Sequence, residues 1–320
     1  MACGANNLGE PAVSGSPVSV SGRGLTPENN AALALTHGLI YVDYTQNGQH
    51  TPATFYSEPH PLHLAGVIRR NIYGARQLAA DPAGNVYVTT QGSRVVPVVE
   101  VYAPGAIKKT KTLHIPSSDF NFIYGVCVAP DSTVYVATAE GFSEVHSVYA
   151  YANGSTHPTS TVYTYPMADE PEACAVDSAG NLYVLYYAGS GSLIDEFAPG
   201  SHTPHTLGIA LQFGFDIGLD PNGNLLVSGY YQSQAAVFVY PPGSTKPSRS
   251  FQSPGTPAVE GFALSSSGTQ LYVNTVLKGS MASAVLVYNY SSGKQVGQFW
   301  GGSKRFGNGL LYIAVTPRAP

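Results

Sequence analysis

The stretch DPAGNVYV, residues 81–88, decides the fold, because it is a tight turn followed at once by a strand. Asp-Pro presets the backbone angle φ of the turn, and Gly-Asn tolerates the positive φ that tight hairpins use. Val and Tyr in the following triplet are enriched in strands. The same turn and triplet return as DSAGNLYV at 177–184 and DPNGNLLV at 220–227. The chain is therefore expected to repeat one β-rich unit.

This unit recurs through most of the chain. Its strand triplet occurs six times, and the central residues lie 43 to 48 positions apart: Tyr41, Tyr87, Tyr135, Tyr183, Leu226 and Tyr272. A short apolar strand precedes most of the turns, and a β-rich run and a short polar strand follow most triplets. Four short strands per repeat of this length are typical of a β-propeller blade.

The repeats predict an all-β fold, with six four-stranded blades in a single β-propeller domain over residues 31–320. Residues 310–317 look like a lone inner strand, so we expect them to pair with N-terminal strands and close the ring. The alternative is a seven-bladed ring, in which residues 31–35 form another inner strand and residues 10–30 an irregular blade. Residues 1–30 are rich in Gly, Pro and Ser and are expected to form a flexible tether.

The DPxGNxYV turn, followed by a VYxPG strand such as VVEVYAPG at 98–105, resembles NHL-repeat propellers. It is also similar to the wider six-bladed group that includes gluconolactonase-like enzymes. The resemblance covers about residues 31–317 and implies a fold rather than an activity. NHL blades usually carry an Asp two residues after the Val of the triplet, and this chain has other residues there: Tyr44, Thr90, Thr138, Tyr186, Gly229 and Thr275.

The composition excludes several functional classes. Charged residues make up 11% of the 320 residues, against roughly 25% in an average soluble domain. A chain with 43% hydrophobic residues and a formal net charge of −4 can bury a core, so disorder is not expected. Only 15 residues are Lys or Arg, which argues against a nucleic-acid partner. No apolar run is long enough for a transmembrane helix.

The three cysteines bear on the cellular compartment. Cys3, in Met-Ala-Cys-Gly, resembles the end of a bacterial lipoprotein signal and is a candidate lipid anchor; an ordinary N-terminus is the alternative. Low charge and abundant Ser, Thr, Gly and Tyr also favour an exported protein: periplasmic, a lipoprotein of the outer surface, or secreted. Cys127 and Cys174 lie in apolar runs and are expected to be buried thiols, with a bridge between them as the alternative.

Oxygen-bearing side chains gather at one end of the predicted ring. Aligning the blades places Glu172, Asp216 and Glu260 within one position of each other, at the start of three inner strands. Asp43 and Asn274 each follow a strand triplet directly, so all five are expected at the same end. Such ligands around one axis suit Ca²⁺ or Mg²⁺. The alternative is that the carboxylates are solvated rim residues or pair with basic residues of neighbouring loops.

Aromatic side chains are expected at the same mouth of the channel. Rings with a few polar partners form good platforms for sugars or flat ligands, although packing between blades is the alternative. One histidine follows a second strand and joins this group. The candidate ligand-binding residues are Phe120, Phe122, His146, Tyr186, Tyr187, Tyr230 and Tyr231.

No nucleophile elbow, phosphate-binding loop or dinucleotide fingerprint occurs in the sequence. The sequence therefore favours a non-catalytic binding module that takes a protein, glycan or small molecule at the channel mouth. The alternative is a divalent-metal-dependent hydrolase or lactonase, in which an ion polarises an ester carbonyl. The resemblance to gluconolactonase-like enzymes implies such a carboxylate-held ion.

Overall fold

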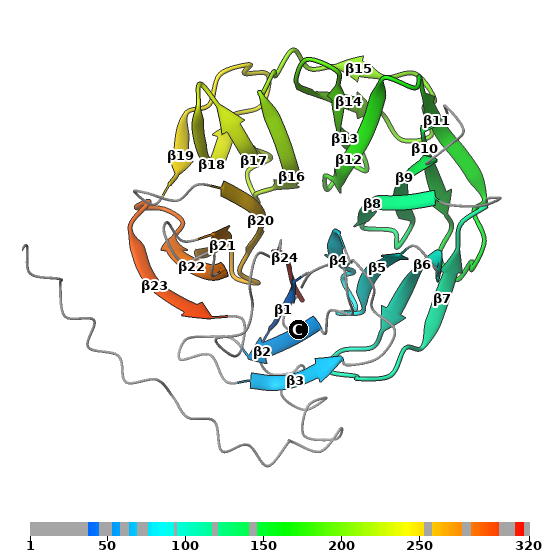
Figure 1. Cartoon of the computed structure of the whole chain (residues 1–320), viewed down its shortest axis with the longest axis horizontal. Helices are drawn as coiled ribbons and strands as arrows, with labels where there is room; N and C mark the ends of the chain where they lie inside the picture. Colours follow the sequence, from blue (N-terminus) through cyan, green and yellow to red (C-terminus); the bar gives the residue numbers. More distant parts are fainter. Residues whose placement is uncertain are drawn as a thin grey trace, which may run out of the picture.

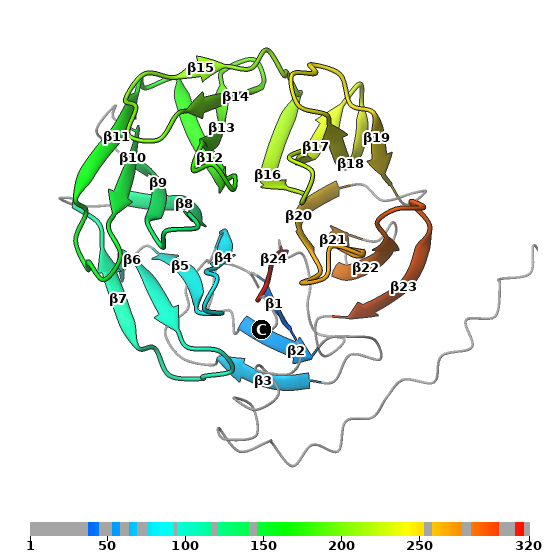
Figure 2. The ribbon, with the colours of Figure 1, turned by 180° about the vertical axis from the view of Figure 1, so that it is seen from behind.

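The computed structural model describes most of the chain from residue 38 onward. The described residues are 38–44, 53–57, 64–68, 76–92, 95–116, 121–140, 146–252, 258–276, 283–300 and 311–316. They form 24 strands and no helix. The strands make six four-stranded sheets arranged around a central channel, as both views of the ring show (Figures 1 and 2).

Each sheet is antiparallel, and its strands are ordered here from the channel to the rim. The first blade contains β24 (Leu311–Val315), β1 (Leu39–Tyr44), β2 (Ala53–Ser57) and β3 (Leu64–Ile68). The second contains β4 (Leu78–Ala80), β5 (Val86–Gly92), β6 (Val95–Tyr102) and β7 (Lys111–His114). The third contains β8 (Asn121–Val128), β9 (Val134–Glu140), β10 (His146–Tyr151) and β11 (Ser160–Tyr165). The fourth contains β12 (Asp169–Val176), β13 (Leu182–Ala188), β14 (Ser192–Phe197) and β15 (His205–Thr206). The fifth contains β16 (Phe213–Leu219), β17 (Leu225–Tyr231), β18 (Gln234–Tyr240) and β19 (Arg249–Phe251). The sixth contains β20 (Ala258–Leu264), β21 (Gln270–Val276), β22 (Ser283–Asn289) and β23 (Gln295–Trp300).

The predicted β-propeller of four-stranded blades is confirmed. Five sheets are each built from four consecutive strands, and the remaining sheet joins β24 from the C-terminal end to β1–β3. In that sheet Tyr41 lies opposite Ala314, so the expected pairing between the two ends of the ring is present. The segments proposed for a seventh blade, residues 10–30 and 31–35, lie outside the described residues. Among the described residues, no helix is long and apolar enough to span a membrane.

The apolar core lies between neighbouring blades. All six residues of β10 are buried, because each central strand packs against sheets on both of its faces. One cluster joins Val148 of the third blade to Val184 of the fourth, and another joins Val237 of the fifth to Val273 of the sixth. This packing holds the inner strands in place around the channel.

The turns that follow the inner strands explain the recurring Asp-x-x-Gly-Asn motif. At Asp220, Oδ1 accepts hydrogen bonds from the backbone N–H groups of Asn222 and Asn224, both at 2.9 Å. Its Oδ2 accepts from Asn224 Nδ2 at 2.7 Å and from the hydroxyl of Tyr290, in the next blade, at 2.7 Å. Asp81 and Asp177 likewise accept hydrogen bonds from the backbone and the side chain of the Asn four residues further on, so one side chain fixes each hairpin.

We expect Asp220→Ala to lower the free energy of unfolding by about 3 kcal/mol, because four hydrogen bonds to a buried carboxylate are lost. Its hydrogen bonds hold the pKa of Asp220 below its usual range. The folded state therefore binds this proton less readily than the unfolded state, and the stabilisation fades as pH falls below about 4. Urea unfolding at pH 7 and pH 3 measures both effects.

Asp131→Ala is the matched control. The carboxylate of Asp131 is exposed in the corresponding turn of the third blade and accepts one backbone hydrogen bond, from Thr133 at 2.9 Å. Equal losses for the two variants would contradict the role assigned to Asp220.

Cys127 and Cys174 form a disulfide between β8 and β12, the inner strands of the third and fourth blades. Their sulfur atoms are 2.09 Å apart and their Cα atoms 5.6 Å apart. The expectation of two separate buried thiols is therefore wrong, although both residues are buried as predicted. The bridge ties neighbouring blades together at the wall of the channel.

Candidate functional site

The inner strands can be superimposed by counting back from the last residue of each strand. At the fourth position from the end, the six residues are Gln77, Gly125, Ala173, Asp216, Gly261 and Tyr312. Three are large and polar, and three are very small. Six side chains converge at this level of the channel, so only some of them can be large. A Cβ at Gly125 would lie 3.0 Å from Cα of Ala173, which explains the glycine there.

Gln77 closes the channel by linking its own blade, the second, to the third, fourth and fifth blades. Its Nε2 donates hydrogen bonds to Asp216 Oδ1 at 2.7 Å and to the backbone oxygen of Cys174 at 3.2 Å. Its Oε1 accepts from the backbone N–H groups of Val126 at 2.8 Å and Cys174 at 3.3 Å. Both donor hydrogens and both acceptor lone pairs of the amide are therefore used.

Asp216 completes this floor. Besides the bond from Gln77, its carboxylate accepts from the backbone N–H groups of Ile217 at 2.9 Å and Phe262 at 3.3 Å. Burial raises its pKa to about 7, against the opposing effect of these three hydrogen bonds. Below the floor lies a cavity of about 180 Å³, lined by inner-strand residues that include Ala79, Ala175, Gly218 and Ala263. Gln77 and Asp216 thus separate the mouth of the channel from its lower part.

At the fifth position from the end, one level above the floor, the inner strands bulge. The pairing with the neighbouring strand skips Tyr124 in β8, Glu172 in β12, Phe215 in β16, and Glu260 with Gly261 in β20. A bulge leaves a residue unpaired and re-aims its side chain, and bulges are common beside binding and active sites. Four consecutive blades therefore present their fifth-position residues in the same irregular way.

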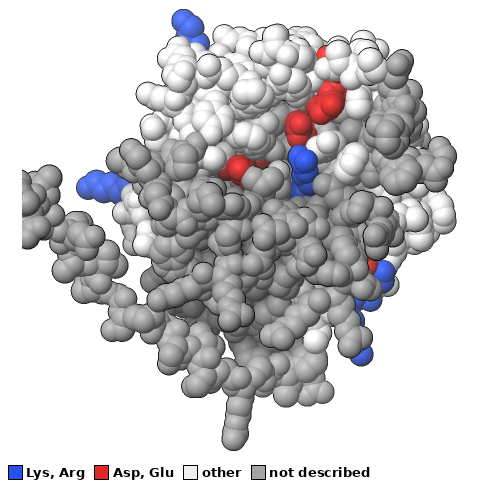
Figure 3. Space-filling model, in the orientation of Figure 1, with Lys and Arg blue, Asp and Glu red and all other residues white. Residues whose placement is uncertain are grey.

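Arg76 holds the same position in the second blade, and three of these residues interact with it. Its guanidinium carbon lies 4.3 Å from the centre of the Tyr124 ring, and its Nη1 lies 3.7 Å from Glu172 Oε2. The positive charge of Arg76 also acts on Glu260, from the sixth blade. Figure 3 shows a basic side chain flanked by acidic ones near the centre of this face. We call Arg76, Tyr124, Glu172 and Glu260 the mouth cluster.

The two carboxyl groups of the mouth cluster are poorly compensated. Burial raises the pKa of Glu172 to about 7, although Arg76 opposes the shift. Burial also raises the pKa of Glu260 to about 7, again against Arg76. Glu260 is 8% exposed, and its Oε2 is buried without a hydrogen-bond partner among the described residues. One guanidinium therefore serves two carboxyl groups and neutralises neither fully.

The predicted metal ligands that the structure describes do not all lie at the mouth of the channel. Within the described part of the chain, no three His, Cys, Asp or Glu side chains are grouped so that they could hold a metal ion. Glu172 and Glu260 do reach the mouth, but the oxygens of Asp216 are bonded within the floor. Asn274 is buried in β21, and the side chain of Asp43 lies outside the described residues. The described residues therefore bring Glu172 and Glu260 to the mouth without Asp216 or Asn274, and the divalent-ion site stays a prediction.

Two of the predicted ligand-binding aromatics are accessible. Phe122 is 42% exposed, and its ring centre lies 6.3 Å from that of Tyr124. Tyr187 is half-buried and stacks on the exposed Phe213, with 5.6 Å between ring centres. Phe120 lies outside the described residues. The tyrosine–phenylalanine stack and Phe122 thus extend an aromatic surface next to the mouth cluster.

The other described aromatic candidates pack against neighbouring rings, Tyr186 buried and Tyr230 and Tyr231 half-buried. Tyr186 is 6% exposed and lies against Tyr165 between two blades, because a central strand buries both faces. Tyr231 packs edge-on against Phe238, and Tyr230 packs edge-on against Phe215. For Tyr186 and Tyr231, inter-blade packing was the better reading of the sequence. The half-buried Tyr230 still senses the charge of Glu260, so its hydroxyl is near the mouth.

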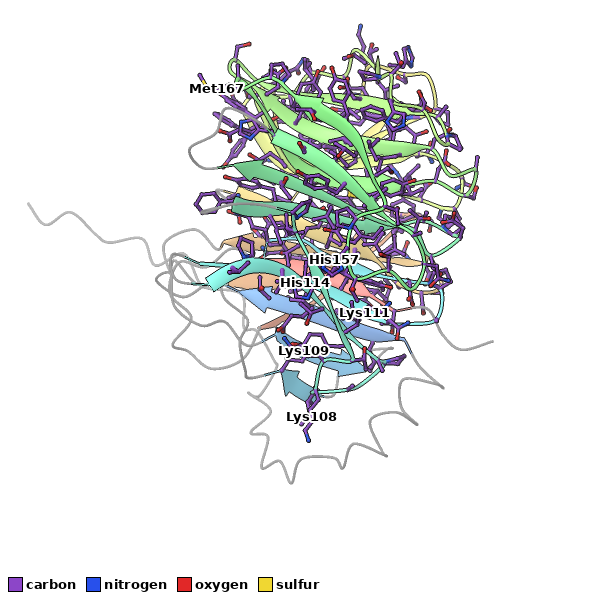
Figure 4. The ribbon with its side chains drawn as sticks, turned by 90° about the vertical axis from the view of Figure 1, so that its right-hand side faces the viewer. Lys108, Lys109, Lys111, His114, His157 and Met167 are labelled. Atoms are coloured by element: carbon purple, nitrogen blue, oxygen red, sulfur yellow. A yellow bond between two sulfur atoms is a disulfide. The ribbon has the colours of Figure 1, made fainter. Side chains whose placement is uncertain are left out.

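His146 is buried rather than displayed. Its Nε2 lies 3.1 Å from the backbone oxygen of Met167, and its Nδ1 has no partner among the described residues. In the side view, Met167 lies at the edge of the ring, apart from His114 and His157 (Figure 4). Those two histidines stack with their ring centres 5.2 Å apart, His114 on β7 and His157 in the turn between β10 and β11. The geometry places no histidine beside the mouth cluster among the described residues.

Sequence reasoning missed Arg76, Gln77 and Tyr312. All three were present in the alignment of the inner strands, at the fifth and fourth positions. The prediction rested on the carboxylates at these positions and did not include Arg76 or Gln77, which occupy the same positions in the second blade. An alignment that includes every residue type at each position of the six inner strands contains both Arg76 and Gln77.

Comparisons with known proteins bear on the fold. No protein-family model and no curated protein sequence matches the chain. Among solved structures, TolB from Acinetobacter baumannii matches with a TM-score of 0.59 and 10% identity, over 89% of this chain and 67% of that chain. A putative gluconolactonase matches with 0.55 and 14%, over 75% and 87%. A chain of a nidogen/laminin complex matches with 0.54 and 12%, over 87% and 98%.

The geometry and these matches define the class: the protein is a β-propeller. Its likeness to gluconolactonase-like propellers is one of fold, since the identities are far too low to carry an activity across.

Proposed function

We propose that the protein is an exported, non-catalytic binding module that takes its ligand at the mouth of the central channel. The observation that carries the proposal is the mouth cluster: bulges at one position in successive inner strands direct Tyr124, Glu172 and Glu260 toward Arg76. The floor below is sealed by Gln77 and Asp216. A ligand would therefore rest on a polar cup with an aromatic rim.

The disulfide supports export. Bridges such as Cys127–Cys174 form and persist in oxidising compartments and are rare in the cytosol. The low content of charged residues is consistent with the same interpretation. Lipidation of Cys3 belongs to this proposal as the means of attachment.

The test is a binding screen with a site-directed readout. Purified protein is screened against glycan and peptide arrays, and the affinity of each hit is measured by calorimetry for the wild type and for Tyr124→Ala. We expect at least a tenfold loss of affinity, because Tyr124 supplies the ring under Arg76 and part of the rim.

Tyr135→Ala is the control, since Tyr135 is a half-buried tyrosine near the start of β9, at the other end of the same blade. Hits that respond to Tyr135→Ala and not to Tyr124→Ala would place the ligand elsewhere and contradict the proposal. The protein is also assayed for hydrolysis of a panel of lactones and esters. Hydrolysis that is lost in Tyr124→Ala would show that the protein is an enzyme and would contradict the proposal of a non-catalytic binding module.

A further inference from the structure

Among the described residues, one buried carboxylate oxygen of the mouth cluster has no hydrogen-bond donor. Glu260 is more than nine-tenths buried, yet its Oε2 has no hydrogen-bond partner among the described residues. Buried carboxylate oxygens normally accept a hydrogen bond, so this oxygen is available to a donor group of a ligand. The donor has to be compact, because Gln77 and Asp216 close the channel directly below.

Arg76 does not supply this donor. Its guanidinium lies over Tyr124 and is 3.7 Å from Glu172, which is beyond hydrogen-bond distance. No ion pair joins Arg76 to Glu260 among the described residues. Glu170 adds a third carboxylate beside Glu172 and acts on its pKa. The described part of the mouth thus holds more acidic than basic groups.

The described lysines do not correct this excess. Lys108, Lys109 and Lys111 lie together on the outer part of the second blade (Figure 4), and Lys109 is already paired with Glu100 at 2.6 Å. Aromatic rings meanwhile border the acidic groups: Tyr124 lies beneath Arg76, and Tyr230 lies close enough to Glu260 to feel its charge. Aromatic faces attract organic cations, and carboxylates attract them more strongly.

We propose that the mouth recognises an ammonium or guanidinium group, which donates to Glu260 while the rest of the ligand lies on the aromatic rim. This inference rests on the proposed function and names its ligand chemistry. Such a group is carried by small amines and by Lys or Arg side chains of a protein. A cation that carries N–H donors satisfies the orphaned oxygen and offsets the acidic excess in one step.

The test uses calorimetry on the full chain with four probes: putrescine, agmatine, the peptide acetyl-Gly-Lys-Gly-amide and its acetylated-lysine counterpart. We expect the three cations to bind and the acetylated peptide not to bind. Tighter binding of the peptide than of the free amines would identify a protein side chain as the source, and the reverse order would identify a small amine. Either order supports the proposal.

Glu260→Gln is the decisive variant, since it keeps the shape and removes the charge. We expect it to weaken cation binding at least tenfold. Glu196→Gln, on β14 near the rim, removes a carboxylate that pairs with His205 instead and is expected to leave the affinity unchanged. Cation binding that survives Glu260→Gln would overturn the inference.

Two further outcomes separate this inference from the proposed function. Neutral glycans that bind in a Tyr124-dependent way, with no binding of the cations, would overturn the inference and leave the binding module intact. Binding of Ca²⁺ without binding of the organic cations would overturn the inference in favour of a metal site, provided that Glu260→Gln abolishes the Ca²⁺ binding. No Tyr124-dependent ligand of any kind would overturn both.

Discussion

Gln77→Leu is expected to lower the free energy of unfolding by about 4 kcal/mol and the melting temperature by roughly 10 °C. Leucine nearly fills the same volume but leaves three buried backbone groups without this partner: the N–H groups of Val126 and Cys174 and the carbonyl of Cys174. It also removes one of the two hydrogen bonds that Asp216 Oδ1 accepts. Each buried polar group left unsatisfied costs about 1 to 3 kcal/mol, and partial rearrangement keeps the total below their sum. Thermal and urea unfolding measure the loss.

Gln234→Leu is the control, because Gln234 is an exposed glutamine at the start of β18. Its replacement is expected to change the unfolding free energy by less than about 0.5 kcal/mol. A Gln77→Leu protein as stable as this control would show that water replaces the amide at no cost. The floor would then be a weak contact and not a structural seal.

In Gln77→Glu we expect the free energy of unfolding to depend on pH. It places a second carboxyl group 2.7 Å from Asp216 Oδ1, and two carboxylates at that distance share one proton. Burial already raises the pKa of Asp216 to about 7, so the pair holds its proton more tightly in the folded than in the unfolded state. Stability is therefore fully present at low pH and falls as pH rises through the folded pKa. A variant more stable at pH 9 than at pH 6 would contradict this.

Local chemistry made the blades predictable. The Asp-x-x-Gly-Asn turns are held by their own residues, as the three bonds from Asn222 and Asn224 to Asp220 show, so they form hairpins wherever they occur. Their spacing then determined the repeat and the closure by β24. Features that depend on a single hairpin could therefore be predicted from the sequence.

The candidate site was predicted only in part, because it depends on how strands from different blades lie beside each other. Glu172 and Glu260 share one position in the inner strand, and both reach the mouth. Asp216 is one position further along, and one step in a strand is enough to turn its side chain into the floor. The bulges at Glu172 and Glu260 place these side chains at the mouth, and the spacing of residues in the sequence does not predict these bulges.

The disulfide was predicted only as an alternative for the same reason. Cys127 is the second residue from the end of β8, and Cys174 is the third from the end of β12. Their positions in the repeat differ, so the alignment of blades does not place them opposite each other. The stagger between neighbouring inner strands brings their Cα atoms to 5.6 Å, and this stagger is a property of the assembled ring.

Removing the disulfide with Cys127→Ala and Cys174→Ala is expected to lower the free energy of unfolding by about 4 kcal/mol. The two cysteines are 47 residues apart, and a bridge that closes a loop of this size restricts the unfolded chain by that amount in the loop-entropy treatment. The folded ring should persist, because the core cluster around the two cysteines already contains small residues, Ala137 and Ala150. Thermal unfolding with and without a reducing agent gives the same comparison for the wild type.

Cys3→Ala is the control for this last experiment, because it removes the third cysteine and leaves the bridge. It is expected to leave the melting temperature unchanged and to abolish the one free thiol of the unreduced, unfolded protein. Three free thiols in the unreduced wild type, or a melting temperature that a reducing agent does not alter, would contradict a stabilising bridge. An intact bridge that contributes about 4 kcal/mol would also strengthen export, since reduction in the cytosol would forfeit a large fraction of a domain's usual 5 to 15 kcal/mol.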